Sequence, residues 1–143
     1  MIKTVIIKIS GSQSSADAPE EENIIEFTTE GMLDKKEDMI SLFYDESEML
    51  GCEDARSMLC ILGEKQVVLE RTGDIVSKLV IEAGKRNNCY YETPYGNMTI
   101  GIHGDYIENS LTENGGKLKM KYTLDSDLRP ISTNMLEITV NEV

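Results

Sequence analysis

The sequence contains a single histidine, His103, through which a catalytic triad or a histidine-ligated zinc site would have to run. Around it, apolar and polar side chains alternate as they do along a β-strand. Met98, Ile100 and Ile102 share the apolar face, and His103 falls on the opposite face. We therefore expect His103 to point to solvent and to take no part in catalysis.

The other candidate ligands are three cysteines, Cys52, Cys60 and Cys89, which with His103 could offer three thiolates and one imidazole to zinc. Structural zinc sites usually take their ligands in close pairs, roughly two to four residues apart, and these cysteines form no such pair. Their odd number and wide spacing also argue against a disulfide framework. We expect Cys60 and Cys89 to be buried free thiols, and we predict neither a metal site nor a cofactor.

Arg71 is the charged residue with the most unusual position. It ends an alternating segment in which Val67 and Leu69 occupy the presumed inner face, and the same alternation carries Arg71 inward, near the end of a strand. A guanidinium is planar and offers several fixed hydrogen-bond donors, which could serve the fold or a ligand carboxylate.

Tyrosines gather in the second half of the chain, at Tyr90, Tyr91, Tyr95, Tyr106 and Tyr122. Tyr91 and Tyr122 fall on the expected inner faces of strands, and Tyr95 falls in a turn at the mouth. Inward tyrosines give a pocket an apolar wall and a polar tip, although they are also ordinary core residues. With Arg71, the candidate ligand-binding residues are thus Tyr91, Tyr95 and Tyr122.

Short strands must position these residues, because a period of two dominates the sequence. In residues 117–124 apolar and polar side chains alternate without exception, and residues 136–140 follow the same pattern. In residues 4–9, Val5, Ile7 and Ile9 alternate with Thr4, Ile6 and Lys8. The run Asn114-Gly115-Gly116 is a strong hairpin signal, since both residue types accept the positive φ of tight turns. About eight to ten short strands with hairpin links predict an antiparallel β-sandwich or barrel.

Two segments do not follow this pattern. Residues 11–22 are small, polar and acidic, and we expect them to form a mobile acidic surface loop. Within residues 53–62, helical spacing fits the apolar residues as well as a strand does. A strand would place Met58, Cys60 and Leu62 on one face, and periodicity alone leaves the choice open. No second core or repeat is evident, so we expect a single domain over residues 1–143.

Composition narrows the function classes further. Hydrophobic residues make up 40% and charged residues 28% of the chain, as in an ordinary globular protein. The formal net charge of −12 repels phosphate backbones and anionic lipid surfaces, so we expect neither nucleic-acid nor membrane binding. No stretch has the length and pattern of a signal peptide or a membrane helix, and we expect the protein to be cytoplasmic.

Several segments together resemble the YwiB-like family, a group of small bacterial proteins classed as a domain of unknown function with a calycin-like (lipocalin-like) β-barrel. The segments are Leu69-Glu70-Arg71-Thr72-Gly73, residues 91–96 leading into Met98 and Ile100, residues 116–122, and Asn134 with Leu136 and Ile138. The resemblance runs from Ile24 to Val140 and implies a closed or nearly closed antiparallel barrel, but no activity. Residues 11–22 look like an insertion, and Glu70 stands where the family usually has an apolar residue.

This resemblance also suggests a role for Arg71. In calycin barrels a basic residue often closes one end by packing on an aromatic ring and donating to backbone carbonyls, and Arg71 resembles it. We favour this structural role over a clamp for a ligand carboxylate, which stays open.

Three functions from different classes remain. The first is a non-enzymatic barrel that binds a small apolar or amphipathic ligand in its interior. The second is a protein-interaction module whose acidic surface meets a basic partner, with a homodimer favoured if a strand edge stays exposed. The third is an enzyme that uses carboxylates and tyrosines. It ranks last because no nucleophile and base are assembled, so we predict no catalytic residue.

Overall fold

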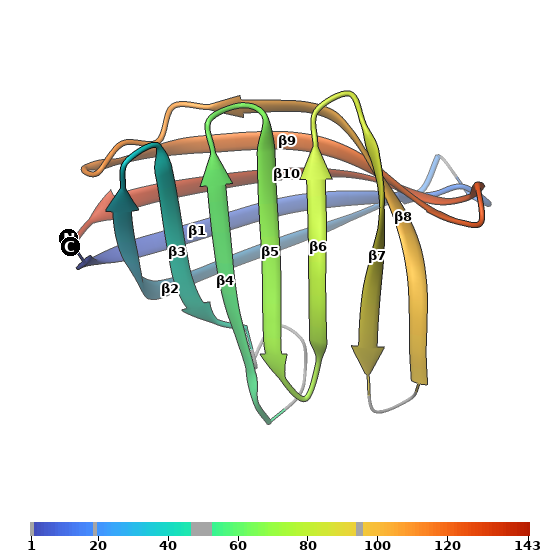
Figure 1. The fold of residues 1–143 in the computed structure, drawn as a ribbon, viewed down its shortest axis with the longest axis horizontal. Helices are drawn as coiled ribbons and strands as arrows, with labels where there is room; N and C mark the ends of the chain where they lie inside the picture. Colours follow the sequence, from blue (N-terminus) through green and yellow to red (C-terminus); the bar gives the residue numbers. More distant parts are fainter. Residues whose placement is uncertain (1, 19, 47–52, 94–95) are drawn as a thin grey trace.

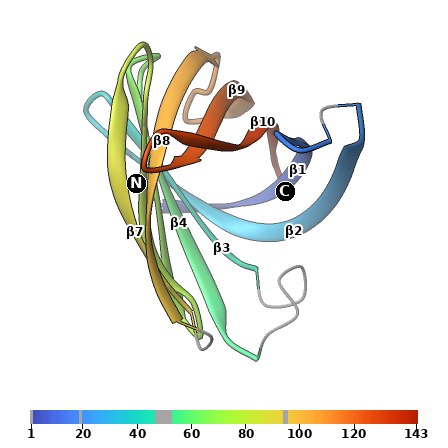
Figure 2. The ribbon, with the colours of Figure 1, turned by 90° about the vertical axis from the view of Figure 1, so that its right-hand side faces the viewer.

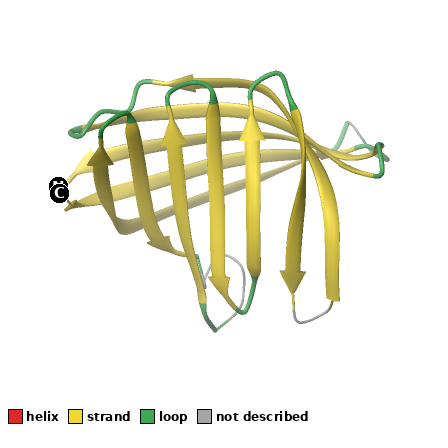
Figure 3. Cartoon of the chain, viewed as in Figure 1, coloured by secondary structure: helices red, strands yellow, loops and turns green. Residues whose placement is uncertain are grey.

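The computed structural model describes residues 2–18, 20–46, 53–93 and 96–143, and every regular element in that part of the chain is a β-strand (Figure 3). The strands are β1 (Ile2–Ser15), β2 (Glu22–Lys36), β3 (Met39–Asp45), β4 (Ala55–Leu62), β5 (Gln66–Gly73), β6 (Val76–Glu82), β7 (Arg86–Thr93), β8 (Gly96–Asn109), β9 (Gly115–Ser126) and β10 (Arg129–Glu142).

These ten strands form a closed antiparallel barrel in which each strand pairs with its neighbours in the sequence. β1 pairs with both β2 and β10, and these pairings close the barrel. In Figure 1, strands β3 to β7 form a front wall, and β1, β2, β9 and β10 cross behind it. Figure 2 shows the front wall nearly edge-on, with β1 and β2 curving away from it. The predicted antiparallel barrel is confirmed.

The inner face of the front wall is built from cross-strand rows of aliphatic side chains. One row pairs Ile40, Ile61, Val67 and Ile81 across β3 to β6, and the next pairs Leu42, Leu59, Leu69 and Leu79. All eight side chains are buried. Buried residues of the opposite wall, among them Ile7, Leu118 and Ile138, complete one core, so aliphatic side chains fill this part of the barrel.

β2 belongs to both walls, because it pairs with β1 along most of its length and with β3 near its end, and Gly31 lies where the second pairing begins. A Cβ atom at this position would lie only 2.5 Å from the Phe43 carbonyl oxygen and 2.6 Å from Ile7 Cδ1. Pairing with β3 begins at the next residue, Met32. Because a side chain cannot fit there, glycine permits the close approach of strands at this corner.

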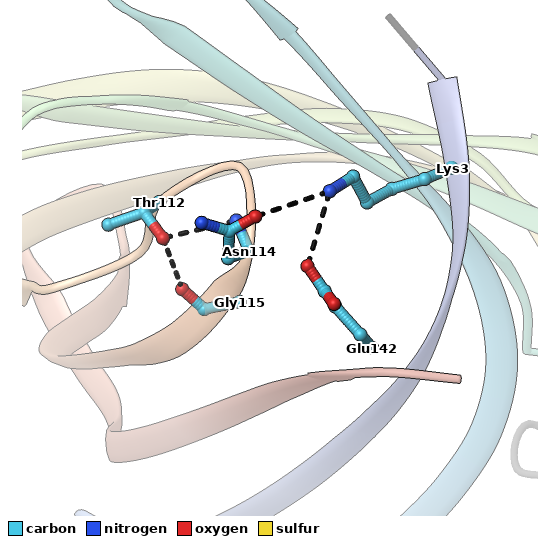
Figure 4. A network of polar contacts seen from close by, with 5 residues as sticks. All are labelled: Lys3, Thr112, Asn114, Gly115 and Glu142. Atoms are coloured by element: carbon cyan, nitrogen blue, oxygen red, sulfur yellow. Dashed lines mark hydrogen bonds and ion pairs between the residues drawn. The ribbon is translucent and has the colours of Figure 1, made fainter.

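Side-chain contacts tie the chain ends to the β8–β9 hairpin (Figure 4). Lys3 Nζ lies 3.5 Å from Asn114 Oδ1 and 3.3 Å from Glu142 Oε1, which links β1, β10 and the hairpin. Within the hairpin, the Thr112 hydroxyl donates to the Gly115 carbonyl oxygen and accepts from the Asn114 backbone N–H. The hairpin signal at residues 114–116 therefore marks the start of β9.

An ion pair on the outer surface connects β7 to β9 across β8. Arg86 donates from Nε to Asp125 Oδ2 at 2.8 Å and from Nη2 to Asp125 Oδ1 at 2.6 Å. The guanidinium passes over Gly101, where a Cβ would lie 2.2 Å from Nη2. The hydrogen bonds from Arg86 hold the pKa of Asp125 below its usual range.

Two expectations from the sequence need correction, for residues 11–22 and for Met98, and the choice left open for residues 53–62 is decided. The loop predicted over residues 11–22 is wrong in its bounds, because β1 continues to Ser15 and β2 begins at Glu22. Its small residues pair with β2 and β10 instead of forming a loop. Residues 55–62 form β4 and no helix. The buried side chains of β4 are Ala55, Ser57, Leu59 and Ile61, so the face with Met58, Cys60 and Leu62 points outward. Met98, which the sequence places on the same face as the buried Ile100, is 57% exposed.

Replacing Leu59 by alanine tests the leucine row. Leu59 is 1% exposed, and the cavity left behind should lower the free energy of unfolding by about 2–5 kcal/mol, measured by urea denaturation. The matched control is Leu62→Ala on the same strand, because Leu62 is 41% exposed and its truncation should cost much less. Equal losses for the two variants would contradict the assigned inner face of β4.

Replacing Asp125 by asparagine tests the surface ion pair. A carboxylate with a lowered pKa stabilises the folded state at neutral pH, and this contribution disappears as the pH falls through the folded-state pKa. The Asp125→Asn variant should therefore be less stable than the parent at pH 7, and the difference should shrink below the ordinary pKa of 3.8. Asp127→Asn, at an exposed position of the same hairpin, is the control. A pH-independent difference would contradict the assignment.

Candidate ligand site at the barrel mouth

One step along the strands from the leucine row, the inner face of the front wall becomes polar. Tyr44, Ser57, Arg71, Ser77 and Tyr91 are paired in order across β3, β4, β5, β6 and β7. We call these five residues the front polar row. It lies toward the lower end of the front wall in Figure 1, and this end of the barrel is called the mouth.

The opposite wall carries a second polar row at the mouth. Gln13 of β1 pairs with Asn134 of β10, and Asn134 pairs with Tyr122 of β9. We call these three residues the rear polar row. The Asn134 side-chain amide donates to the Ser132 hydroxyl at 3.1 Å, which fixes its orientation. The mouth is thus lined from both walls by hydrogen-bonding side chains.

Glu46 organises the front polar row. Its backbone N–H donates to the Ala55 carbonyl oxygen at 2.8 Å, which holds the residue after β3 against β4. Its side chain is 1% exposed. One carboxylate oxygen accepts from the Ser57 hydroxyl at 2.6 Å, the other lies 3.3 Å from Arg71 Nη2, and the Tyr44 hydroxyl also bonds to the carboxylate. The buried charge is therefore paired and hydrogen-bonded, as burial of a carboxylate requires.

Arg71 keeps a donor that Glu46 does not use. The Arg71 side chain is 15% exposed and its Nε is buried, with no hydrogen-bond partner among the described residues. The Ser77 hydroxyl, on the residue paired with Arg71, is buried and likewise unpartnered in that part of the chain. Two unsatisfied polar groups therefore lie side by side on the inner face, where most buried polar groups have a partner.

The protonation states of the mouth follow from burial and from this ion pair. Burial opposes the charge of Arg71, but the Glu46 carboxylate, Tyr44, Tyr91 and Tyr122 together outweigh it, and the pKa of Arg71 is raised. Burial and, after it, Glu46 raise the pKa of Tyr44 well above its ordinary value. Burial also raises the pKa of Tyr122. At neutral pH Arg71 is therefore charged, and the Tyr44 and Tyr122 hydroxyls are protonated.

A pocket of about 190 Å³ opens at the mouth. Its polar lining includes Arg71, Tyr122 and Asn134, and its apolar lining includes Ile9 and Ile25. An engineered cavity of about 150 Å³ is large enough to bind benzene. The pocket is therefore large enough for a small molecule that has a polar group and a short apolar part.

The structure places three of the four predicted ligand-binding residues at the mouth. Arg71, Tyr91 and Tyr122 point inward as expected, while Tyr95 lies outside the described residues. Arg71 meets the Glu46 carboxylate, which differs from the expected bonds to backbone carbonyls.

His103, Cys60 and Cys89 do not line the pocket at the mouth. His103 is 46% exposed and its Nδ1 lies 2.9 Å from Asp105 Oδ1, which confirms its place at the surface. Cys89 is buried as predicted, and its Sγ accepts from the Val80 backbone N–H at 3.3 Å. Cys60 is only partly buried, contrary to expectation, because it sits on the outer face of β4. Cys52 lies outside the described residues.

The described part of the chain offers neither a cluster of metal ligands nor a membrane-spanning helix. Within residues 2–18, 20–46, 53–93 and 96–143, no three His, Cys, Asp or Glu side chains are grouped so that they could hold a metal ion. The same part of the chain contains no helix long and apolar enough to span a membrane.

Sequence reasoning missed Glu46 and its partners Tyr44 and Ser57. The available signal was the alternation that identified Arg71, because Ile40 and Leu42 begin an inward series that continues through Tyr44 to Glu46. An inward carboxylate and an inward guanidinium at the same end of neighbouring strands predict an ion pair.

The Glu46–Arg71 pair can be tested by a double-mutant cycle. Arg71→Met leaves the Glu46 carboxylate buried without its cation, and the free energy of unfolding should fall by about 3–5 kcal/mol. Glu46→Gln and the double variant complete the cycle, and the two losses should be non-additive by at least about 1 kcal/mol. Arg56→Met is the control, because Arg56 is exposed on the outer face of β4. Additive losses would contradict a direct pair.

Comparison with known proteins places the chain in a family. Residues 7–138 match the family described as "Domain of unknown function (DUF1934)". The fold matches the crystal structure of the ywiB protein from Bacillus subtilis with a TM-score of 0.86 and 18% sequence identity, over 99% of this chain and 93% of that chain. No curated protein sequence matches. At this identity the structural likeness shows the fold alone, whereas the family match spans most of the sequence, so the chain belongs to the DUF1934 family of domains of unknown function.

Proposed function

We propose that the protein binds a small amphipathic molecule at the mouth of its barrel. The observation that carries the proposal is Arg71, a cation whose side chain lines a pocket of about 190 Å³ and whose buried Nε–H has no partner among the described residues. A buried donor without an acceptor is costly, by about 1–3 kcal/mol, and a ligand that supplies the acceptor recovers this free energy.

The pocket lining fits an amphipathic molecule better than a purely polar one. Ile9, Ile25 and Leu136 give the pocket an apolar side, and Arg71, Tyr122 and Asn134 give it a polar side. Small-molecule sites typically combine a mainly apolar wall with a few polar groups that fix orientation. The ligand would therefore place its polar group toward Arg71 and its apolar part against the isoleucines.

Binding belongs at the mouth and not deeper in the barrel. The leucine row and the isoleucine–valine row above it are buried and packed against the opposite wall. Core side chains in such rows pack at the density of organic crystals, and displacing them would cost stability. The proposed binding site is therefore the mouth of the barrel and not its whole interior.

NMR of the arginine side chains tests this proposal. Hexanamide, hexanoate and hexan-1-ol serve as probes, because each joins one polar group to the same short apolar chain. At least one probe should cause a saturable shift of the Arg71 Nε–Hε signal. The Arg86 Nε–Hε signal should stay in place, because Arg86 Nε already donates to Asp125. If no probe moves the Arg71 signal up to its solubility limit, or if both signals move alike, the proposed site is wrong.

A further inference from the structure

We infer that the polar group of the ligand is an uncharged hydrogen-bond acceptor, such as an amide, ester or ketone carbonyl, and not a carboxylate or phosphate. This inference rests on the proposed function and concerns the same pocket. The positive charge of Arg71, taken alone, would favour binding of an anion.

That charge is already balanced inside the protein. Glu46 is 1% exposed and lies 3.3 Å from Arg71 Nη2, so the two buried charges form a neutral pair. Ser57 and Tyr44 donate to the same carboxylate and hold it in place. Arg71 therefore offers a ligand a strongly polarised N–H group but no excess positive charge.

Apart from this pair, the polar rows of the mouth are uncharged. The front polar row adds Tyr44, Ser57, Ser77 and Tyr91 to Arg71, and the rear polar row consists of Gln13, Asn134 and Tyr122. A ligand carboxylate would bring a second negative charge beside Glu46 with no second cation in either row. Like charges placed together cost several kcal/mol in a desolvated site, and the net charge of −12 opposes the approach of an anion.

The unpartnered groups match a carbonyl oxygen. Arg71 Nε–H is a donor, and the Ser77 hydroxyl can donate as well. The two residues are direct cross-strand partners, so their Cβ atoms are about 4.5–5.5 Å apart on one face. Of the two residues, Arg71 lines the pocket and Ser77 does not, so a carbonyl oxygen in the pocket would accept from Arg71 without bringing a charge.

Hexanamide and hexanoate form a matched pair for the test, because they have the same shape and differ in charge. At pH 7.5, hexanamide should bind the unmodified protein at least about tenfold more tightly than hexanoate, measured by titration of the Arg71 Nε–Hε signal. Equal or tighter binding of hexanoate would overturn the inference and leave the proposed function standing. Binding of neither hexanamide nor hexanoate would overturn the inference, and the proposed function would fall with it if hexan-1-ol also failed to bind.

The Glu46→Gln variant tests the same inference by shifting the expected preference between the two probes in the opposite direction. It keeps a side chain of similar shape but removes the buried negative charge, so the charge of Arg71 becomes uncompensated. The ratio of the two affinities should then shift toward hexanoate by at least about tenfold. An unchanged ratio in a folded variant would overturn the inference. The comparison on the unmodified protein decides the question if the variant does not fold.

Discussion

The arrangement of the mouth depends on one buried ion pair, between Glu46 and Arg71. A carboxylate that is 1% exposed is tolerated only when donors surround it, and here a guanidinium and the hydroxyls of Ser57 and Tyr44 do so. These contacts join the end of β3 to β4 and β5. They also turn the Arg71 guanidinium so that Nη2 meets the carboxylate while Nε has no partner in the described part of the chain.

The remainder of the barrel restricts where a ligand could bind. Two rows of aliphatic side chains occupy the inner face next to the front polar row. The leucine row and the front polar row are adjacent inward-facing rows, so the core begins directly beside the mouth. The outer ion pair of Arg86 and Asp125 shows the alternative for an arginine in this fold. Arg86 Nε and Arg86 Nη2 both donate to the Asp125 carboxylate, so neither of these two donors is left for a ligand.

Much of the fold and part of the site could be predicted from the sequence, because side chains of a strand alternate strictly. Alternation alone placed Arg71 and Tyr122 inside the barrel. It failed for residues 53–62, where a helix and a strand fit the same short apolar run. Residues 11–22 were misjudged because small polar residues suit loops, although pairing with β2 and β10 extends β1 through them. Glu46 was missed because its burial depends on contacts with β4 and β5, and such long-range pairing is not visible in one strand.

The most direct test of the account is a high-resolution crystal structure of the protein grown with saturating hexanamide. We expect an amide oxygen within hydrogen-bond distance of Arg71 Nε, with the alkyl chain against Ile9 and Ile25 and with Glu46 still bound to Nη2. A structure in which Glu46 bonds to both Nε and Nη2 of Arg71, as Asp125 does with Arg86, and in which the pocket holds no hexanamide, would contradict it.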